Sequence, residues 1–247
     1  MTSTHGHSWT GAGNVQADYT TDGQNKYTNI AGATKGCDAK GNLSTSGSLS
    51  LTFDAESRLA TGAEYSFYRD PLVRLALSTY AGNFDFGGSQ LNEQTDAYGS
   101  LYRRYVFGAD RGKPVVWYEG AGTANRRYMD ADGRGSIIRV TNASGATLRI
   151  NTYDEFGVPG PANLGRFQFD GQVFLRNEPL PFRGRLYSPA FGRFVEPDAT
   201  GQNNGLSPYD VAHGDLGNGI DAPEVQTYWS RCSPCDLPPL SDSSSAG

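Results

Sequence analysis

Cysteine, methionine and histidine are scarce in this chain, which narrows the kinds of site that it can carry. The 247 residues include three Cys, two Met and three His. Cys37 stands alone, while Cys232 and Cys235 form a C-S-P-C sequence in a Pro/Ser-rich tail. This pair lacks the strand and helix of a thioredoxin-like motif and also a second pair of zinc ligands. We therefore expect no redox site, no metal and no cofactor.

Long hydrophobic runs and an excess of positive charge are also missing. No stretch approaches the roughly 20 apolar residues of a membrane helix, and residues 1–14 lack the apolar core of a signal peptide. The formal net charge is −5, opposite in sign to the charge that favours nucleic-acid binding. The sequence predicts no membrane span, no signal peptide in this chain and no nucleic-acid partner.

The residues that are abundant are typical of a β protein rich in turns. Thirty-two Gly and 13 Pro accompany an aromatic fraction of 12% and an apolar fraction of only 37%. Such a composition favours sheets that bury Tyr and Phe on one face over helices or a thick aliphatic core. We therefore expect an all-β protein.

A short turn pattern recurs along the chain. It reads CDAKGNL at residues 37–43, FDAESRL at 53–59 and RDPLVRL at 69–75, so that successive aspartates lie 16 residues apart. Less regular copies follow at 95–101 and 153–157. The Asp side chain opens a tight turn by accepting a hydrogen bond from the backbone two residues on, and Gly supplies a positive φ. The predicted turn residues are Asp38, Gly41, Asp54, Asp70, Asp96, Gly99, Asp154 and Gly157.

Strand patterns lie between and after these turns. Residues 49–53 alternate between apolar and polar side chains, and residues 102–107, 136–141 and 148–153 form three further predicted strands. Residues 142–145 give a hairpin-loop signal between the last two. Because a single short hairpin is not stable alone, the equal spacing predicts hairpins that stack into an array. An ordinary β-sandwich is the alternative, with the similarity of the turns arising by chance.

Residues 181–201, PFRGRLYSPAFGRFVEPDATG, follow the repetitive region and combine aromatic rings with three arginines. Arg183, Arg185 and Arg193 either bind a carboxylate or stack on Tyr187 and Phe191, and stacking is the preferred interpretation. The stretch ends with Asp198. It is predicted to finish the array and to present an acid at its end.

These segments resemble YD repeats and the repeat-associated core of the Rhs family. The turn copies resemble its YDANGNL and YDPLGRL sequences, and residues 181–201 resemble its core signature, R-x-Y-x-P-x-x-G-R-F followed by D-P-x-G. The resemblance covers residues 19 to 201. The matching core positions are Arg185, Tyr187, Gly192, Arg193, Phe194 and Pro197.

The resemblance implies an all-β array of YD-repeat hairpins that forms a curved or spiral sheet and is closed by an Rhs core segment. On this basis we expect an N-terminal extension (1–18, disordered or strand-like), the hairpin array (19–165), the core (166–225) and a disordered tail (226–247) as the remnant of a variable C-terminal region. In the family, the array encloses a C-terminal toxin or effector polypeptide.

The resemblance also implies an aspartyl protease pair. Asp198 and Asp221 match the two aspartates with which family members cleave their own chain, and cleavage here would follow Val225. This chain departs from the pattern, because Ala199 replaces a Pro and the Gly-Leu after the second Asp is absent. Both aspartates also suit ordinary turns beside Gly or Pro.

The expected function is therefore structural: a shell and plug fragment of an Rhs-type polymorphic toxin, bacterial, and secreted or at the cell surface in a full-length context. One alternative is an aspartyl autoprotease that uses Asp198 and Asp221. Another is a surface carbohydrate-binding module, with glycans stacked on Trp117 and Tyr118. The expected partners are the C-terminal effector or a longer YD-repeat chain that pairs with exposed sheet edges, and surface glycans in the second alternative.

Overall fold

The computed structural model describes residues 19–23, 26–30, 32–62, 65–69, 75–78, 82–87, 90–109, 113–175, 180–182, 185–198 and 207–211. Within these ranges the backbone forms 19 β-strands and one short 3-10 helix. All strand pairs there are antiparallel. The prediction of an all-β protein is confirmed.

The strands form three sheets in which each strand pairs with its neighbours in the chain. The first sheet contains β1 (Tyr19–Thr21), β2 (Tyr27–Ile30), β3 (Ala33–Cys37), β4 (Leu43–Ser46) and β5 (Leu49–Ser50). The second contains β6 (Thr52–Phe53), β7 (Leu59–Gly62), β8 (Tyr65–Arg69), β9 (Leu75–Ser78), β10 (Gly82–Gly87), β11 (Gln90–Thr95), β12 (Leu101–Phe107), β13 (Pro114–Glu119), β14 (Arg126–Ala131), β15 (Ile137–Thr141) and β16 (Thr147–Ile150). The third contains β17 (Leu180–Phe182), β18 (Arg185–Ser188) and β19 (Arg193–Phe194), and the 3-10 helix η1 spans Phe169–Gly171.

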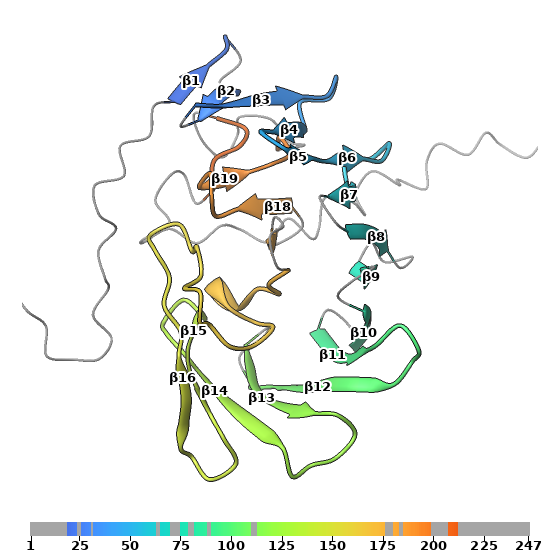
Figure 1. Cartoon of the computed structure of the whole chain (residues 1–247), viewed down its shortest axis with the longest axis vertical. Helices are drawn as coiled ribbons and strands as arrows, with labels where there is room; N and C mark the ends of the chain where they lie inside the picture. The colour runs from blue at the N-terminus through green and yellow to red at the C-terminus, as the bar shows by residue number, and fades with distance from the viewer. Residues whose placement is uncertain are drawn as a thin grey trace, which may run out of the picture.

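The first sixteen strands follow one another around a curve, and we call them the wall. Figure 1 shows β18, β19 and η1 on the inner side of this curve. We call residues 180–182, 185–198 and 207–211 the plug, and residues 151–175 the inner strip. The wall is therefore a meander of hairpins whose concave side is filled by the later part of the same chain.

One predicted strand is interrupted. Residues 49–53 do not form a single strand: β5 ends at Ser50, β6 begins at Thr52, and the two belong to different sheets. Leu51, between them, donates its backbone N–H to the carbonyl of Ser44 at 2.8 Å and is buried. The sequence does not reveal this break, because the alternation of apolar and polar side chains continues through Leu51. The other predicted strands correspond to β12, β15 and β16, the last of which ends at Ile150, before the predicted end at residue 153.

The same turn joins many of the hairpins. At Asp38 the carboxylate accepts hydrogen bonds from the N–H groups of Lys40 and Asn42, both at 2.9 Å, and the Asp38 N–H donates to the Asn42 carbonyl at 2.9 Å. The structure places the carboxylates of Asp54, Asp96 and Asp154 in the same arrangement. Asp70 lies outside the described residues.

Two more loops have this turn. Asp132 accepts from the N–H groups of Arg134 and Ser136, and Asn142 accepts from those of Ser144 and Ala146. Residues 142–145 were predicted as a hairpin loop, whereas the Asp132 turn was not singled out in the sequence. Ala131 stands there at the position that is aromatic in the YD pattern.

Glycine at the fourth position of the turn provides a left-handed backbone. Gly41, Gly99 and Gly157 have φ values of 91°, 81° and 86°, and Ser57 has a φ of 62° in the copy that lacks glycine. A residue with a Cβ is strained in this region, which is why glycine is preferred there.

This strain can be tested in the open turns. A Cβ at Gly99 or Gly145 would meet no atom within 4 Å, so Gly99→Ala and Gly145→Ala should lower the free energy of unfolding by about 1–2 kcal/mol through backbone strain alone. Gly133→Ala is the matched control, because Gly133 has equally open space and no positive φ. Urea unfolding of the three variants measures the effect. An equal loss in Gly133→Ala would contradict this explanation.

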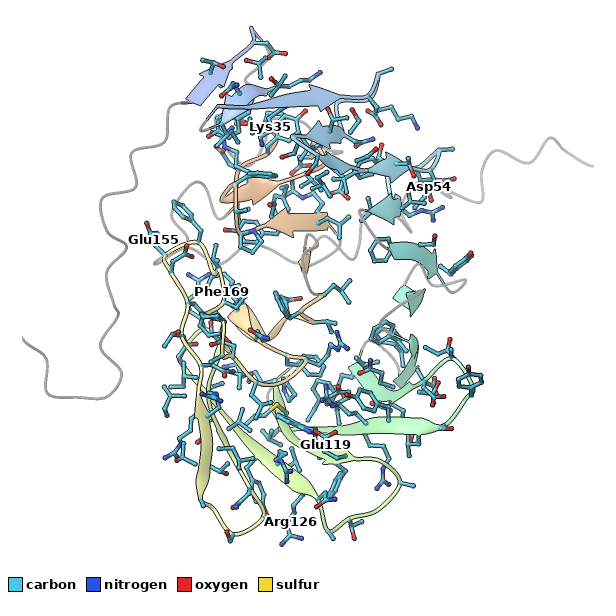
Figure 2. All side chains as sticks on the ribbon, viewed as in Figure 1. Lys35, Asp54, Glu119, Arg126, Glu155 and Phe169 are labelled. Carbon is cyan, nitrogen blue, oxygen red and sulfur yellow. The ribbon has the colours of Figure 1, made fainter. Side chains whose placement is uncertain are left out.

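The inner face of the second sheet carries the largest apolar cluster. Its buried members are Phe84, Leu91, Tyr105, Trp117, Met129, Ile137, Val140, Phe167 and Leu175. The inner strip covers this face: the Phe167 ring packs edge-on against Tyr105 and Phe107, with centroids 4.9 Å and 5.7 Å away. Phe169, the first residue of η1, also lies on the inner side of the curve (Figure 2). The wall is thus stabilised by contacts with residues that come after it in the chain.

Candidate functional site

The plug is fixed to the first part of the wall by apolar packing and by backbone hydrogen bonds. Leu186 and Val195 form one buried cluster with Leu51 and Leu59 of the wall. The Val195 carbonyl accepts a hydrogen bond from the Leu43 N–H at 2.8 Å. The core signature therefore lies against strands that precede it by more than 120 residues.

Tyr187 occupies the centre of the plug. Its side chain is fully buried, and its hydroxyl donates to the Phe156 carbonyl at 2.7 Å. The ring packs edge-on against Phe194, with 6.2 Å between centroids, and belongs to a cluster with Phe169 and Val211. Burial raises the pKa of the Tyr187 hydroxyl well above its usual value, so this group is a hydrogen-bond donor to the inner strip rather than an acid.

Asp198, the predicted catalytic residue, is buried beside Arg185. The Arg185 Nη2 and Asp198 Oδ2 atoms are 3.7 Å apart, and the two side chains are only 9% and 4% exposed. Arg185 also donates to the Pro208 carbonyl at 3.2 Å, and the same carbonyl accepts the Asp198 N–H at 2.8 Å. The guanidinium carbon lies 3.6 Å from the centroid of the Phe194 ring. Arg185 thus binds a carboxylate and stacks on a ring at the same time.

Arg193 has the same double role with other partners. Its guanidinium carbon lies 4.2 Å from the centroid of the Tyr27 ring, and its Nη2 atom is 3.7 Å from Asp210 Oδ1. Arg185 and Arg193 stack on aromatic rings as predicted, but on rings other than the ones proposed for them. The rings are Phe194 and Tyr27, whereas the ring of Phe191 lies under Lys35, with Nζ 4.5 Å from its centroid. Arg183 is outside the described residues.

Two other signature positions contact distant segments. Gly192 has a φ of 64°, and a Cβ there would lie 2.7 Å from the Phe156 ring. Pro197 lies next to Gly41, where a Cβ would be 3.5 Å from the Pro197 ring. Tyr209 donates its hydroxyl to the Gly41 carbonyl at 2.8 Å, across 168 residues of sequence. The end of the plug is therefore anchored to the first turns of the wall.

The chemistry of this site is dominated by ion pairing and packing. An aspartyl protease needs two carboxyl groups that share a proton, whereas the ion pair described for Asp198 joins it to a guanidinium. Asp221, its predicted partner, and Val225 lie outside the described residues. In the part of the chain that the structure describes, no group of three His, Cys, Asp or Glu side chains is placed to hold a metal ion, and no helix is long and apolar enough to cross a membrane.

A polar network on the inner side of the wall was missed by the sequence analysis. Glu119 accepts hydrogen bonds from Trp117 Nε1 at 2.8 Å and from Arg103 Nε at 3.2 Å. Nearby, the Tyr105 hydroxyl donates to the buried Gln94 side chain at 3.3 Å. Period-2 alternation could have grouped these residues on one face, but it could not have told which face is buried.

Trp117 cannot serve as a glycan platform. Its side chain is 1% exposed and lies in the core of the second sheet, against Gly165 of the inner strip, where a Cβ would be 3.3 Å from the indole ring. The interpretation of Trp117 as a surface aromatic was therefore wrong. Its neighbour Tyr118 points to the other face of the sheet.

Buried tyrosines predict a loss of stability in alkali. Burial is the main cause that raises the pKa of Tyr105 and of Tyr209 to about 12, whereas tyrosine in an unfolded chain titrates near pH ~10. Between about pH 10 and pH 12 the unfolded state loses these protons and the folded state keeps them. The free energy of unfolding should therefore fall as pH rises through this window, by at most ~1.4 kcal/mol per pH unit for each tyrosine.

Urea unfolding between about pH 8.5 and pH 11 measures this slope. Tyr105→Phe should make the fall of the unfolding free energy with pH shallower, because the variant removes one of the buried tyrosines whose pKa is raised. Tyr98→Phe is the control, since Tyr98 is 94% exposed and should leave the slope unchanged. Identical slopes in the wild type and in Tyr105→Phe would contradict the prediction.

Comparison with known proteins gives distant relatives. No family model matches the chain. The tRNA3(Ser)-specific nuclease WapA of Bacillus spizizenii is 23% identical over 211 residues, and the tRNA nuclease WapA of Bacillus subtilis is 22% identical over 211 residues. Each alignment covers 77% of this chain and 9% of the relative. The chain therefore spans about 9% of the length of the curated relatives that it matches.

A solved structure has the same fold. A chain of the Photorhabdus luminescens Tc holotoxin pore, determined with a substitution in TccC3, superposes with a TM-score of 0.59 at 14% identity. The superposition covers 83% of this chain and 13% of that chain. The predicted fold, a curved array of β-hairpins closed by a later segment, is confirmed. The two WapA proteins are distant relatives and support the predicted resemblance only in part.

Proposed function

We propose that this chain is a structural part of an Rhs-type toxin protein, in which the wall is a section of shell and the plug closes its concave side. In this role it presents or encloses a C-terminal effector polypeptide and belongs to a secreted or cell-surface protein. Its partners are that effector or a longer YD-repeat chain. The distant relatives named tRNA nucleases support this toxin context.

The observation that carries the proposal is the attachment of the plug to the start of the wall. Leu186 and Val195 complete the apolar cluster of the β4–β7 region, and Tyr209 reaches the turn at Gly41. A segment that only ended the array would pack against the last strands, β15 and β16. Instead, these contacts connect the plug to the first strands, as closure of a shell requires.

The expectation that the plug stabilises the wall can be tested by hydrogen exchange. Leu186→Ala should cost about 2–5 kcal/mol, because it leaves a cavity in the shared cluster. Backbone amides of β4 and β7 should then exchange faster, while those of β13 to β15 keep their rates, since their cluster does not include Leu186. Leu148→Ala is the matched control, because Leu148 is 39% exposed on β16. Unchanged exchange in β4 and β7 would count against the proposed plug.

An aspartyl autoprotease is the second candidate function. The observation that favours it is the position of Asp198, a carboxylate with 4% exposure at the end of the plug, because buried acids in such places are candidates for catalysis. Its proposed partner is Asp221, with cleavage after Val225. The pairing of Asp198 with Arg185 favours the structural role instead.

Mass spectrometry and urea unfolding separate the two roles of Asp198. We expect a single mass of 26.6 kDa and a loss of about 3–5 kcal/mol in Asp198→Asn, which leaves the buried Arg185 without its carboxylate. Asp210→Asn is the control, because it breaks an ion pair of equal length whose carboxylate is 20% exposed, and it should cost less than about 1 kcal/mol. Fragments that end at Val225 and disappear only in Asp198→Asn would establish the protease.

A further inference from the structure

A small hollow lies at the seam between the first sheet and the plug. Its volume is about 40 Å³, and one water molecule takes roughly 10–15 Å³ of such space. The lining includes the cationic side chains of Lys26, Lys35 and Arg193 and the rings of Tyr27 and Phe191. We call this feature the seam pocket. It has room for about three water molecules or for one small polyatomic ion.

Lys35 reaches the seam pocket from the buried face of β3. Successive side chains of a strand point to opposite faces, and Thr34 is exposed whereas Lys35 is only 8% exposed. Figure 2 shows Lys35 between the first sheet and the strands of the plug. Lysine is almost never buried this deeply unless an anion pairs with it. A lysine in this position therefore requires an explanation.

The ammonium group of Lys35 lacks an anionic partner in the part of the chain that the structure describes. Its Nζ atom donates to Ser46 Oγ at 2.6 Å and lies 4.5 Å from the centroid of the Phe191 ring. Among those residues no carboxylate oxygen lies within 4.0 Å of it. An ammonium group has three N–H donors, so two are left without a hydrogen bond there. Burial lowers the pKa of Lys35, as expected for a cation that has lost water without gaining an anion.

The two other cations at the seam pocket differ in their partners. Arg193 is compensated, because Asp210 Oδ1 lies 3.7 Å from its Nη2 atom. Lys26 extends along the turn at Gly41, where a Cβ would lie 3.4 Å from Lys26 Cε. Within the described residues, no ion pair shorter than 4.0 Å involves the Lys26 ammonium. In that part of the chain, two ammonium groups thus border the pocket without a carboxylate of their own.

Two aspartates act on the side of the pocket that Tyr209 forms. Burial is the main cause that raises the pKa of Tyr209, and the charges of Asp22 and Asp38 add to it. Each of these carboxylates is held by hydrogen bonds from backbone N–H groups of its own loop. In the described part of the chain, neither forms an ion pair with Lys35. Their negative charge therefore does not replace an anion at Lys35.

We propose that the seam pocket binds a small oxyanion, either a carboxylate or a phosphate, through the ammonium groups of Lys35 and Lys26. The oxygens of such an ion accept charge-assisted hydrogen bonds from ammonium groups, and these bonds are stronger than neutral ones. The remaining N–H donors of Lys35 match this chemistry. A neutral ligand would leave the buried charge uncompensated. A sugar ring or a peptide segment is too large for a volume of about 40 Å³.

A bound oxyanion would also join the wall to the plug, because residues of both line the pocket. A ligand that binds only the folded state stabilises that state by mass action. The effect on closure rests on the proposed shell role, whereas the binding itself does not. Occupancy of the pocket is therefore expected to make the plug harder to release from the first sheet.

Thermal unfolding of the full chain in Tris buffer tests the site, with sodium phosphate and sodium acetate as probes and sodium chloride of equal ionic strength as the reference. At least one probe should raise the Tm in a saturable manner, with a Kd of about 1 mM or lower by titration calorimetry. At a concentration of about 100 times the Kd, the rise should be about 5 °C or more. A rise with phosphate alone identifies a free tetrahedral ion as the ligand. A rise with acetate identifies the carboxylate group that an acidic side chain presents.

Three substitutions locate the bound ion. Lys35→Met keeps the length of the side chain and removes its charge, so it should abolish the response to the probe. It should also raise the Tm in chloride alone, because it removes a buried charge that has no anionic partner. Lys26→Met should weaken binding by about tenfold. Lys113→Met is the matched control, since Lys113 precedes β13 and does not line the pocket, and it should leave the response unchanged.

The proposal fails if neither probe at about 100 mM raises the Tm above its value in chloride. It also fails if the response persists in Lys35→Met, because the ion then binds elsewhere. A lower Tm of Lys35→Met in chloride would likewise contradict it, by showing that Ser46 and Phe191 already satisfy the ammonium group. Hydrogen exchange of Leu186→Ala in chloride buffer is independent of these results, so the shell proposal stands or fails separately.

Discussion

Each hairpin of the wall has one apolar face, and a meander of such hairpins is stable only if something covers that face. The chain supplies the cover itself. Phe167 and Leu175 of the inner strip close the second sheet, and Leu186 and Val195 of the plug close the region of β4 to β7. Each of these parts of the wall is therefore expected to be stable only together with the later segment that covers it.

The same hydrogen-bonded turn recurs in successive hairpins along the wall. In each copy that the structure describes, the Asp or Asn side chain accepts two backbone N–H groups that the strands leave unpaired, and a left-handed residue follows. Neighbouring turns also contact each other, since Asn42 donates to the Ser57 hydroxyl at 3.1 Å. The spacing of 16 residues between Asp38 and Asp54 therefore has a physical meaning: it is the length that places one turn beside the next.

The sequence predicts these local features well because they depend on local chemistry. The turn at Asp38 and the hairpin loop at 142–145 follow from residue types that favour left-handed or capped backbone. The break at Leu51 and the partners of Arg185 and Arg193 could not be predicted in the same way. They depend on which distant segment lies against each residue, and neither alternation nor composition contains that information. The resemblance to Rhs proteins supplied the curved array, but no ring or carboxylate partner.

Trp117 and Tyr118 show this limit in its simplest form. Adjacent residues on a strand face opposite sides of the sheet, so one of the two had to be inside, and the pattern of β13 alone does not say which. The inner strip decides it, because Gly165 and Phe167 lie on the side of Trp117. The indole N–H of Trp117 donates to Glu119 in the polar network on the inner side of the wall. The Tyr118 ring lies beside the Arg104 guanidinium on the outer side. A single packing contact therefore assigns one aromatic to the core and the other to the outer face of the sheet.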